Sequence, residues 1–539
     1  MKVTRKKRTK MNIIAKQVMA ARAVSTPLIA IETPDPGATN RVLFDALITN
    51  AKKRKTNPPA MFQWDIANGL RPLDENSQTV LASLLEPFGG DPGATVDPVN
   101  LGTILQKTPA GTFIVASNLH RFWEAERFNP AVVQTIWNLR DPFKRSARTF
   151  VMTMSDCNLP AELRHDVVVF TEAMPTQEEL SPIVLKLHEN ANLPKPDDDF
   201  VAKSTSALSG LAKQQAEQAA AMAIFAGNEK NLETLDLDTL RHQQQQQIEQ
   251  TPGLSIYDGD ASFDGLKGLD SLTGFLQGVI KGKRPPKAFI FVDEIEKMLA
   301  GALGGGSDSS GTSQEQLGYM LSHMEDTNAR GILLVGPAGT GKSELAKACG
   351  REGDCWTVGY DVGATKGSLV GETGAMTRRA LRVVESMAQG EAFWIATCNS
   401  INALPPELRR RFSYGTWFVD LPNQSARKAM WKLYGERYDV KPNAKVDDDG
   451  WTGAEIKTCA SMASDMNIKV TEAQHFISPV SRSSAETIDS LRRLATGRFR
   501  SAADGGFYKP PSSSRRSRQV EPSPEVLVET ERLMDMPES

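Results

Sequence analysis

The sequence contains few cysteines and lacks long apolar runs. Its five cysteines among 539 residues are scattered, and no two have the spacing of a metal site or a redox motif. We therefore expect ordinary thiols in a reducing, cytoplasmic environment. No stretch approaches the roughly 18 apolar residues that mark a membrane-spanning helix, and no apolar signal-peptide core follows the basic N-terminus.

Net charge is nearly absent as well. The chain has 63 Lys and Arg against 65 Asp and Glu, a formal net charge of −2, so no overall field draws it to nucleic acid or to an anionic membrane. The zinc-protease motif H-E-x-x-H is missing, which argues against proteolysis by that chemistry. The length is sufficient for two or three domains, each with its own core.

Short apolar runs alternate with helix-forming stretches in two separate regions, which favours an α/β fold with parallel sheets. Between these regions the composition turns rich in Ala and Gln, and the end of the chain is rich in Pro and Ser. These changes divide the chain into six predicted parts: a basic N-terminal segment (1–24), a first α/β module (25–190), a helical subdomain and linker (191–262), a second α/β module (263–425), a helical lid (426–500) and a disordered tail (501–539).

An internal repeat links the two α/β regions. FIVASN at 113–118 and LPAELR at 159–164 recur in the same order as FIFVDE at 289–294 and LPPELR at 404–409, each pair followed by an apolar strand. Several matched elements in one order are unlike a chance match. We interpret the chain as two copies of one α/β module.

The strongest motif is GPAGTGKS, which fits the phosphate-binding pattern G-x-x-x-x-G-K-[ST] (Walker A) at every position. An apolar strand precedes it and a helix-forming segment follows, as the motif requires. Backbone N–H groups would surround the phosphates of ATP, Lys342 would face the β- and γ-phosphates, and Ser343 would ligate Mg²⁺. The predicted phosphate-binding residues are Gly336, Pro337, Ala338, Gly339, Thr340, Gly341, Lys342 and Ser343.

Hydrolysis also needs a carboxylate for the metal and a group that polarises water. The segment FIFVDEIEK ends an apolar strand in Asp293 and Glu294, whereas the downstream candidate CWTVGYDVG offers only Asp361. We interpret Asp293 as a ligand of Mg²⁺ and Glu294 as the group that polarises the attacking water (Walker B).

This acid strand precedes the phosphate loop, which reverses the usual order. Sequence neighbours need not be neighbours in a parallel sheet, so a block from 288 to about 328 could have moved as one unit. Only Gly390 and Glu391 join a helix to the next strand where the block would otherwise lie. The hypothesis requires Asp293 to lie beside Ser343.

The first module lacks these groups. Ser117 and Asn118 stand where the second module has its acid pair, and the candidate phosphate loop TPDPGATN at 33–40 has no lysine. We therefore predict no hydrolysis in the first module and interpret it as a structural or regulatory platform.

Further polar groups follow the strand FWIATCN. Asn399 ends that strand and suits the role of holding the lytic water, although a plain strand cap is the alternative. The run PPELRRRF then supplies three arginines that either form a solvated turn or act as an arginine finger on a neighbouring subunit. These are Arg409, Arg410 and Arg411.

Together these residues resemble the AAA+ ATPases, in the AAA subgroup proper. The resemblance rests on GPAGTGKS, FIFVDE, ATCN, ELRRRF, SLVGETG and WTGAEI. It implies a homo-oligomer, with six subunits as the family's habit, in which Leu369 and Val370 grip a protein substrate in a central pore. It also implies that the adenine lies near FDGLKGL and WTGAEI, at Leu266, Lys267, Gly268, Gly453 and Ala454.

The layout of residues 26–500 is similar to that of plastid and cyanobacterial reading-frame AAA+ proteins related to the ATPase part of FtsH. The resemblance implies an ATP-hydrolysing ring that remodels or threads a protein partner. One alternative is a nucleic-acid-associated motor or loader, supported only by the basic residues near 2–10 and by RRSR in the tail. The other is a nucleotide-binding switch or scaffold, in which the displaced acid block fails to complete the site.

Overall fold

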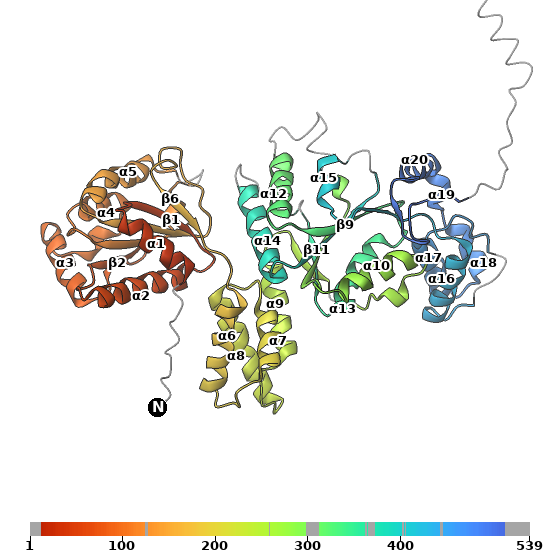
Figure 1. Ribbon diagram of the computed structural model, residues 1–539, viewed down its shortest axis with the longest axis horizontal. Coiled ribbons are helices and arrows are strands. Elements are labelled where there is room, and N and C mark those ends of the chain that lie inside the picture. The colour runs from red at the N-terminus through yellow and green to blue at the C-terminus, as the bar shows by residue number, and fades with distance from the viewer. Residues whose placement is uncertain are drawn as a thin grey trace, which may run out of the picture.

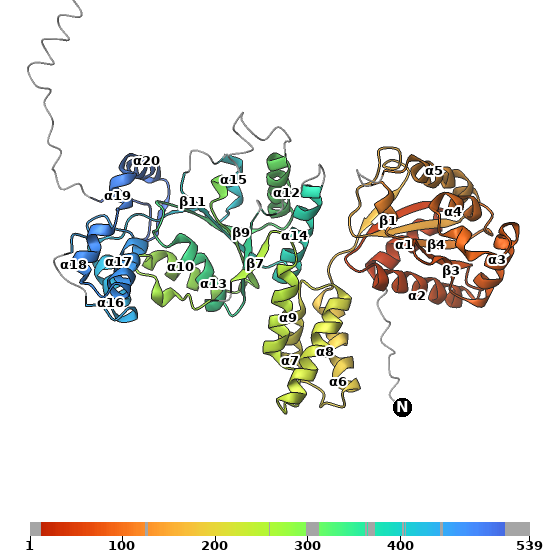
Figure 2. The same ribbon diagram turned by 180° about the vertical axis from the view of Figure 1, so that it is seen from behind.

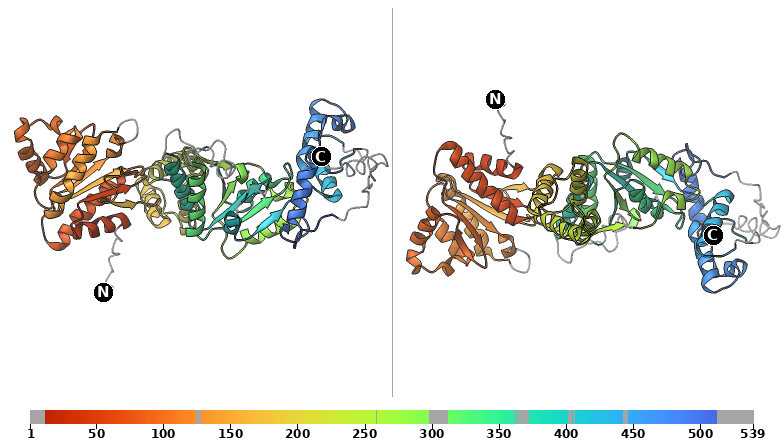
Figure 3. Two further views of the ribbon diagram at one scale, coloured as in Figure 1. Left: turned by 90° about the horizontal axis from the view of Figure 1, so that it is seen from above. Right: turned by 90° about the horizontal axis from the view of Figure 1, so that it is seen from below.

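The computed structural model describes residues 12–123, 128–257, 259–297, 312–361, 364, 372–400, 404, 406–441 and 446–511. Two α/β modules are joined by a helical bundle, and a helical lid follows the second module (Figures 1 and 2). Seen from above and below, these parts form an elongated row (Figure 3). Two mixed, mostly parallel sheets flanked by helices confirm the predicted fold class.

The first module is a six-stranded sheet with the strand order β3-β2-β4-β5-β1-β6. Helices α1 and α2 cover one face, and α3, α4 and α5 cover the other. Among its described strand pairs, β3 runs antiparallel to β2 and the others are parallel. The elements are α1 (Ile13–Ala23), β1 (Leu28–Glu32), α2 (Pro36–Arg54), β2 (Met61–Asp65), β3 (Gly69–Pro72), α3 (Glu75–Leu85), α4 (Pro98–Leu105), β4 (Phe113–Ser117), α5 (Pro130–Arg145), β5 (Thr149–Met154) and β6 (Val168–Thr171).

The helical bundle consists of α6 (Gln177–Asn190), α7 (Asp198–Leu208), α8 (Lys213–Glu229) and α9 (Leu237–Glu249). Small side chains of α8, among them Ala216, Ala220 and Ala223, are fully buried and let the helices approach closely. The predicted boundary at residue 190 is wrong. Helix α6 belongs to the bundle because its apolar residues Leu180 and Val184 pack in the bundle core.

The second module has the strand order β13-β12-β9-β11-β8-β10-β7. Strand β7 comes from the segment predicted as a linker, and it pairs antiparallel with β10. The elements are β7 (Leu254–Tyr257), α10 (Asp270–Ile280), β8 (Ala288–Val292), α12 (Thr312–Asp326), β9 (Arg330–Val335), α13 (Lys342–Glu352), β10 (Trp356–Tyr360), α14 (Glu372–Ala388), β11 (Ala392–Cys398), α15 (Pro406–Arg411) and β12 (Thr416–Phe418).

The two sheets have the same arrangement in space. The order β6-β1-β5-β4-β2-β3 in the first corresponds to β12-β9-β11-β8-β10-β7 in the second, including the antiparallel outer strand. The strand that carries the acids, β8, therefore occupies the place of β4. Along the chain, however, β4 follows the loop strand β1, whereas β8 precedes the loop strand β9. The same sheet is built from two different chain orders.

The lid contains α16 (Gln424–Arg437), α17 (Gly453–Asp465), α18 (Val470–Ala473), α19 (Val480–Ser483) and α20 (Ala485–Ala495). The chain then returns to the second sheet as β13 (Arg500–Ser501), which pairs parallel with β12. The prediction of a disordered tail from residue 501 is wrong for residues 501–511, because Tyr508 is buried, packs against Phe418 and donates a hydrogen bond to Asp420 at 2.5 Å.

The N-terminal boundary differs from the prediction too. Helix α1 begins at Ile13, inside the segment predicted as basic and separate, because Ile14, Val18 and Met19 pack against α2 and the sheet. The five cysteines carry free thiols. Among the described helices, none is both long and apolar enough to cross a bilayer.

The short connection between α14 and β11 is fixed by ion pairs of Glu391 with two arginines. The carboxylate of Glu391 accepts hydrogen bonds from Arg284 at 2.8 Å and from Arg330 at 2.7 Å. Its backbone oxygen accepts a further bond from the N–H of Lys287 at 3.0 Å. Glu391 thus ties together the segments that begin β8, β9 and β11, at the place where the chain order departs from that of the first module.

We expect Glu391→Gln to lower the free energy of unfolding of the second module by about 1–2 kcal/mol, because it leaves the half-buried Arg330, and the exposed Arg284, without their carboxylate. Urea denaturation followed by Trp fluorescence measures this change. The control Glu436→Gln, on the exposed face of α16, should change the free energy by less than about 0.5 kcal/mol. Equal effects of the two variants would contradict this role of Glu391.

Candidate active site

The phosphate-loop motif lies between β9 and the first turn of α13. Gly339 and Gly341 have φ values of +78° and +90°, which glycine adopts without strain. A Cβ at Gly336 would meet the backbone oxygen of Val419 at 2.0 Å, so the residue after β12 leaves no room for a side chain there. The loop therefore presents its backbone and the N-terminus of α13, whose N–H groups and dipole favour an anion.

Lys342 is almost fully buried within this loop. Its Nζ donates hydrogen bonds to the backbone oxygens of Gly336 at 2.8 Å and Pro337 at 2.6 Å. Burial lowers the pKa of Lys342 to about 8, partly offset by nearby carboxylates, of which Glu296 has the largest effect. The lysine is thus folded back against the loop and retains only part of its usual preference for the charged form.

Ser343 and Asp293 lie side by side. The hydroxyl of Ser343 donates a hydrogen bond to Oδ1 of Asp293 at 3.0 Å, and Thr397 on β11 donates to the same oxygen. The contact arises because β11 alone separates β8 from β9, and parallel strands end at the same edge of the sheet. The juxtaposition that the displaced-block hypothesis requires is present.

This pair fits a magnesium ion. A serine hydroxyl and a carboxylate are the hard oxygen ligands that Mg²⁺ selects, and Mg²⁺ is commonly held by one or two protein groups together with the phosphates of its nucleotide. Both oxygens stand beside the loop that would bind those phosphates.

Glu294 and Asn399 also lie together at this edge. Glu294 has a φ of +47°, an uncommon conformation for a side-chain-bearing residue, and its N–H donates to the hydroxyl of Thr397 at 2.8 Å. The side-chain amide of Asn399 donates to the Glu294 carboxylate at 3.0 Å. Strands β8, β9 and β11 thus each contribute a group to one site.

Two neighbours of Glu294 were not identified from the sequence. Lys297 forms an ion pair with Glu294, and Glu296 accepts a hydrogen bond from the N–H of Asn399 at 2.8 Å. The hydrogen bond that Lys297 donates to the Glu294 carboxylate raises the pKa of Lys297. The i, i+3 spacing of Glu294 and Lys297 at the start of a helical turn is a signal that could have indicated this pair.

The first module retains the geometry of the site with neutral groups. The amide of Asn40 donates to the hydroxyl of Ser117 at 3.1 Å, in the place of the bond between Ser343 and Asp293. Asn118 has a φ of +60°, as Glu294 has +47°. The N-terminus of α2, which corresponds to the phosphate-binding N-terminus of α13, is capped by Asp35, whose Oδ1 accepts from the N–H of Ala38 at 2.9 Å.

The three arginines of α15 differ in their surroundings. Arg411 donates a hydrogen bond at 2.6 Å to Glu325 on α12, so it is held within its own chain. Arg410 is exposed, and Arg409 is half-buried. The predicted pore positions Leu369 and Val370 lie outside the described residues.

The segments predicted to lie near the adenine do meet at the phosphate loop. The N–H of Ala454 donates to the backbone oxygen of Gly339 at 3.2 Å, which joins the lid to the loop. The side chain of Leu266 lies 3.9 Å from a Cβ built at Gly341, and Gly268, with a φ of +80°, packs against α16. Lys267 is half-buried, and Gly453 begins α17.

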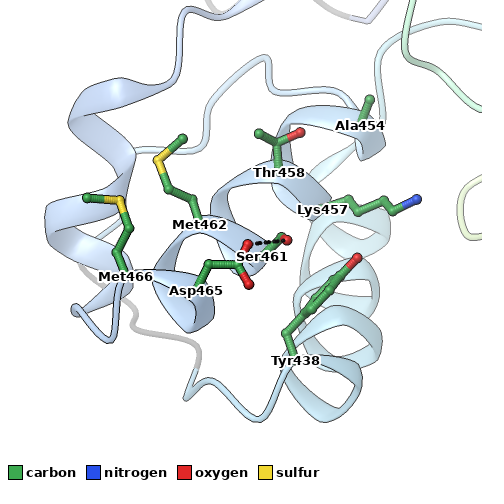
Figure 4. Close-up of a pocket in the computed structure, with 8 residues that line it drawn as sticks. All are labelled: Tyr438, Ala454, Lys457, Thr458, Ser461, Met462, Asp465 and Met466. Atoms are coloured by element: carbon green, nitrogen blue, oxygen red, sulfur yellow. Dashed lines mark hydrogen bonds between the residues drawn. The ribbon is translucent and has the colours of Figure 1, made fainter.

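A pocket of about 560 Å³ opens on the lid rather than at the phosphates (Figure 4). It is lined by the outer side of α17 and by Tyr438, and it includes Ala454 but no residue of the phosphate loop. Along α17, the hydroxyl of Ser461 donates to the carboxylate of Asp465 at 3.2 Å. The pocket therefore adjoins the predicted adenine contact, and the residues that line it do not include Asp293, Glu294 or Ser343.

The sheet order, the phosphate-loop motif before α13 and the acids after β8 are consistent with a P-loop fold of the AAA+ type. Residues 16–171 match the family model of the SpoVK-like AAA ATPase, N-terminal domain. The resemblance to AAA+ ATPases is thereby confirmed, and it supports ATPase activity in general.

The chain is also similar to plastid-type relatives described as uncharacterized AAA domain-containing protein ycf46. It is 23% identical over 517 residues to the relative from Guillardia theta, and the alignment covers 87% of this chain and 88% of the relative. It is 23% identical over 402 residues to that of Gracilaria tenuistipitata var. liui, covering 65% and 72%. For Pyropia yezoensis the identity is 22% over 432 residues, covering 69% and 80%.

The lowered pKa of Lys342 predicts a pH dependence of ATP binding. Phosphate charge beside Lys342 raises its pKa above the value of about 8 in the free protein. At pH values between the free and the ATP-bound pKa of Lys342, ATP binding therefore takes up a proton. The affinity for ATP should be constant below about pH 8 and should fall by up to about tenfold per pH unit above it. Fluorescence anisotropy of labelled ATP from pH 7 to 9.5 measures this.

The control is Lys347→Gln, which changes a lysine on the same helix outside the loop and should leave the pH profile unchanged. A dissociation constant that stays flat from pH 7 to 9.5 would show that Lys342 does not take up a proton on binding.

Proposed function

We propose that this protein is an ATP-hydrolysing ring ATPase that remodels or threads a protein partner. The observation that carries the proposal is the hydrogen bond between Ser343 and Asp293, with Glu294 and Asn399 paired at the same sheet edge. A phosphate loop, a metal-ligand pair and a group that polarises water are what ATP hydrolysis requires. The proposal excludes proteolysis of the H-E-x-x-H kind.

The geometry supports a role for each of these residues. Residues Gly336 to Ser343 would bind the phosphates through backbone N–H groups and the Lys342 ammonium. Ser343 and Asp293 would hold Mg²⁺, which supplies neutralisation of the phosphate charge. Glu294 would polarise the attacking water, and Asn399 would orient both that water and the Glu294 carboxylate.

The assembly is part of the same proposal. A homo-oligomer, with six subunits as in comparable ATPases, would allow an arginine of α15 to reach the nucleotide of the adjacent subunit. Arg410 is the best candidate because it is exposed, whereas Arg411 is paired with Glu325. The pore positions, the protein substrate and a cytoplasmic location also belong to the proposal.

We expect Glu294→Gln to bind ATP with unchanged affinity and to lose at least about 100-fold in steady-state turnover, because the amide cannot accept a proton from water. A coupled phosphate-release assay with Mg²⁺ and ATP measures this. Glu344→Gln, which removes an exposed carboxylate on α13, is the matched control and should retain full turnover.

The alternatives give different results in the same assay. If the wild type and Glu294→Gln both bind ATP and neither hydrolyses it, the protein is a switch or scaffold and the catalytic assignment is wrong. Stimulation of turnover by DNA or RNA that falls steeply with salt would favour a nucleic-acid motor. Capture of a protein by the ATP-bound Glu294→Gln variant would support the remodelling function.

A further inference from the structure

Helix α14 is the element through which the second module contacts the first. Arg382 on α14 forms an ion pair with Glu32, the last residue of β1, which is 8% exposed. One helical turn earlier, Arg378 lies 3.9 Å from Asp156. In Figures 1 and 2, α14 lies on the side of the second module that faces the first. Two arginines of one helix face thus meet two carboxylates of the first module.

These carboxylates lie where the second module has its nucleotide site. Glu32 directly precedes the loop at 33–40 that corresponds to the phosphate loop. Asp156 follows β5, which corresponds to β11, the strand that leads to Asn399. The corresponding sheet edge therefore carries the proposed nucleotide site in the second module, and in the first module it contacts the arginine side chains of α14.

Asp35 fastens the helical bundle to the same edge. One carboxylate oxygen accepts from Ala38 at the start of α2, and the other accepts from the N–H of Gln214 in the first turn of α8 at 3.1 Å. One buried carboxylate thus caps two helices of different domains, and both helix dipoles favour its negative charge.

The bundle reaches the far end of α14 as well. The N–H of Gly210 donates to the hydroxyl of Ser386 at 3.1 Å, and Gln389 donates to the hydroxyl of Ser209 at 3.1 Å. Gly210 has a φ of +88°, and a Cβ there would meet the side chain of Met387 at 2.7 Å. The turn between α7 and α8 is therefore shaped to receive α14 closely.

Helix α14 connects these contacts to the proposed catalytic strands. It packs directly on β8, β11 and α12, and its residues Val383, Val384 and Met387 share a core with Ile290 and Val292 of β8. Asp293 and Glu294 follow directly on β8. A displacement of α14 would thus be felt at the carboxylates, because a packed core transmits small shifts.

We propose that the first module is an internal docking domain: the sheet edge that corresponds to the nucleotide site of the second module binds the arginine face of α14 and thereby positions β8 for turnover. The docking rests on the contacts alone, whereas the effect on turnover also rests on the ATPase function proposed above. Glu32 and Arg382 are positioning residues in this scheme, since they act on the site through α14.

The test is charge reversal in the full chain. Arg382→Glu places like charges against Glu32, and the double variant Glu32→Arg with Arg382→Glu restores an opposite pair. Arg379→Glu is the matched control, because Arg379 is an exposed arginine on the same helix. Hydrogen exchange without nucleotide reports the docking, and kcat and KM for ATP report its effect on turnover.

We expect Arg382→Glu to raise amide exchange about tenfold or more at 28–40 and 376–388, and to lower kcat by about threefold to tenfold with KM unchanged. The double variant should regain most of the protection from amide exchange and most of the wild-type kcat. Glu32→Gln, a milder change, should shift exchange in the same direction by a smaller factor. Arg379→Glu should behave as the wild type in both assays.

Two results would overturn the docking: equal exchange in Arg382→Glu and Arg379→Glu, or no recovery in the double variant. A change in exchange with an unaltered kcat would overturn the link to turnover. If the wild type does not hydrolyse ATP, the proposed function fails, and hydrogen exchange still decides the docking, because that measurement needs no nucleotide.

Discussion

The hydrogen bond between Ser343 and Asp293 depends on one geometric property of parallel sheets, namely that their strands end at a common edge. The phosphate loop leaves β9, the acids leave β8, and Asn399 follows β11 between them. No covalent nearness is needed, because backbone pairing sets the distance between strand ends. The chain order of the strands is therefore free to vary while the side chains of the site stay together.

The two modules show how one scaffold is used in two ways. In the second, charged groups gather at the edge, and burial of Lys342 lowers its pKa. In the first, Asn40 and Ser117 replace the corresponding charged or metal-ligating pair, and Asp35 caps the helix whose counterpart would bind phosphate. The same edge carries Glu32, which pairs with α14 of the second module. The edge that lacks the phosphate-loop lysine and the acid pair is thus the edge that contacts the second module.

Motifs with local geometry could be predicted well from the sequence. The phosphate loop, the acid strand and the repeated module all depend on residue types at short spacing, so their elements were found where expected. The boundaries at α1, α6 and residues 501–511 could not be predicted. Each depends on distant partners: α1 on α2, α6 on α7 and α8, and Tyr508 on Phe418 and Asp420.

By itself, the sequence determined the chemistry at each position, including a lysine in a glycine-rich loop, two acids after an apolar strand, and neutral residues in the corresponding places of the first module. Only the tertiary structure decided that the acids and the loop meet, that Glu294 pairs with Lys297 and Asn399, and that Arg382 reaches Glu32. The physical reason is that strand pairing and helix packing bring together residues from distant parts of the chain, whereas motif patterns record only local spacing.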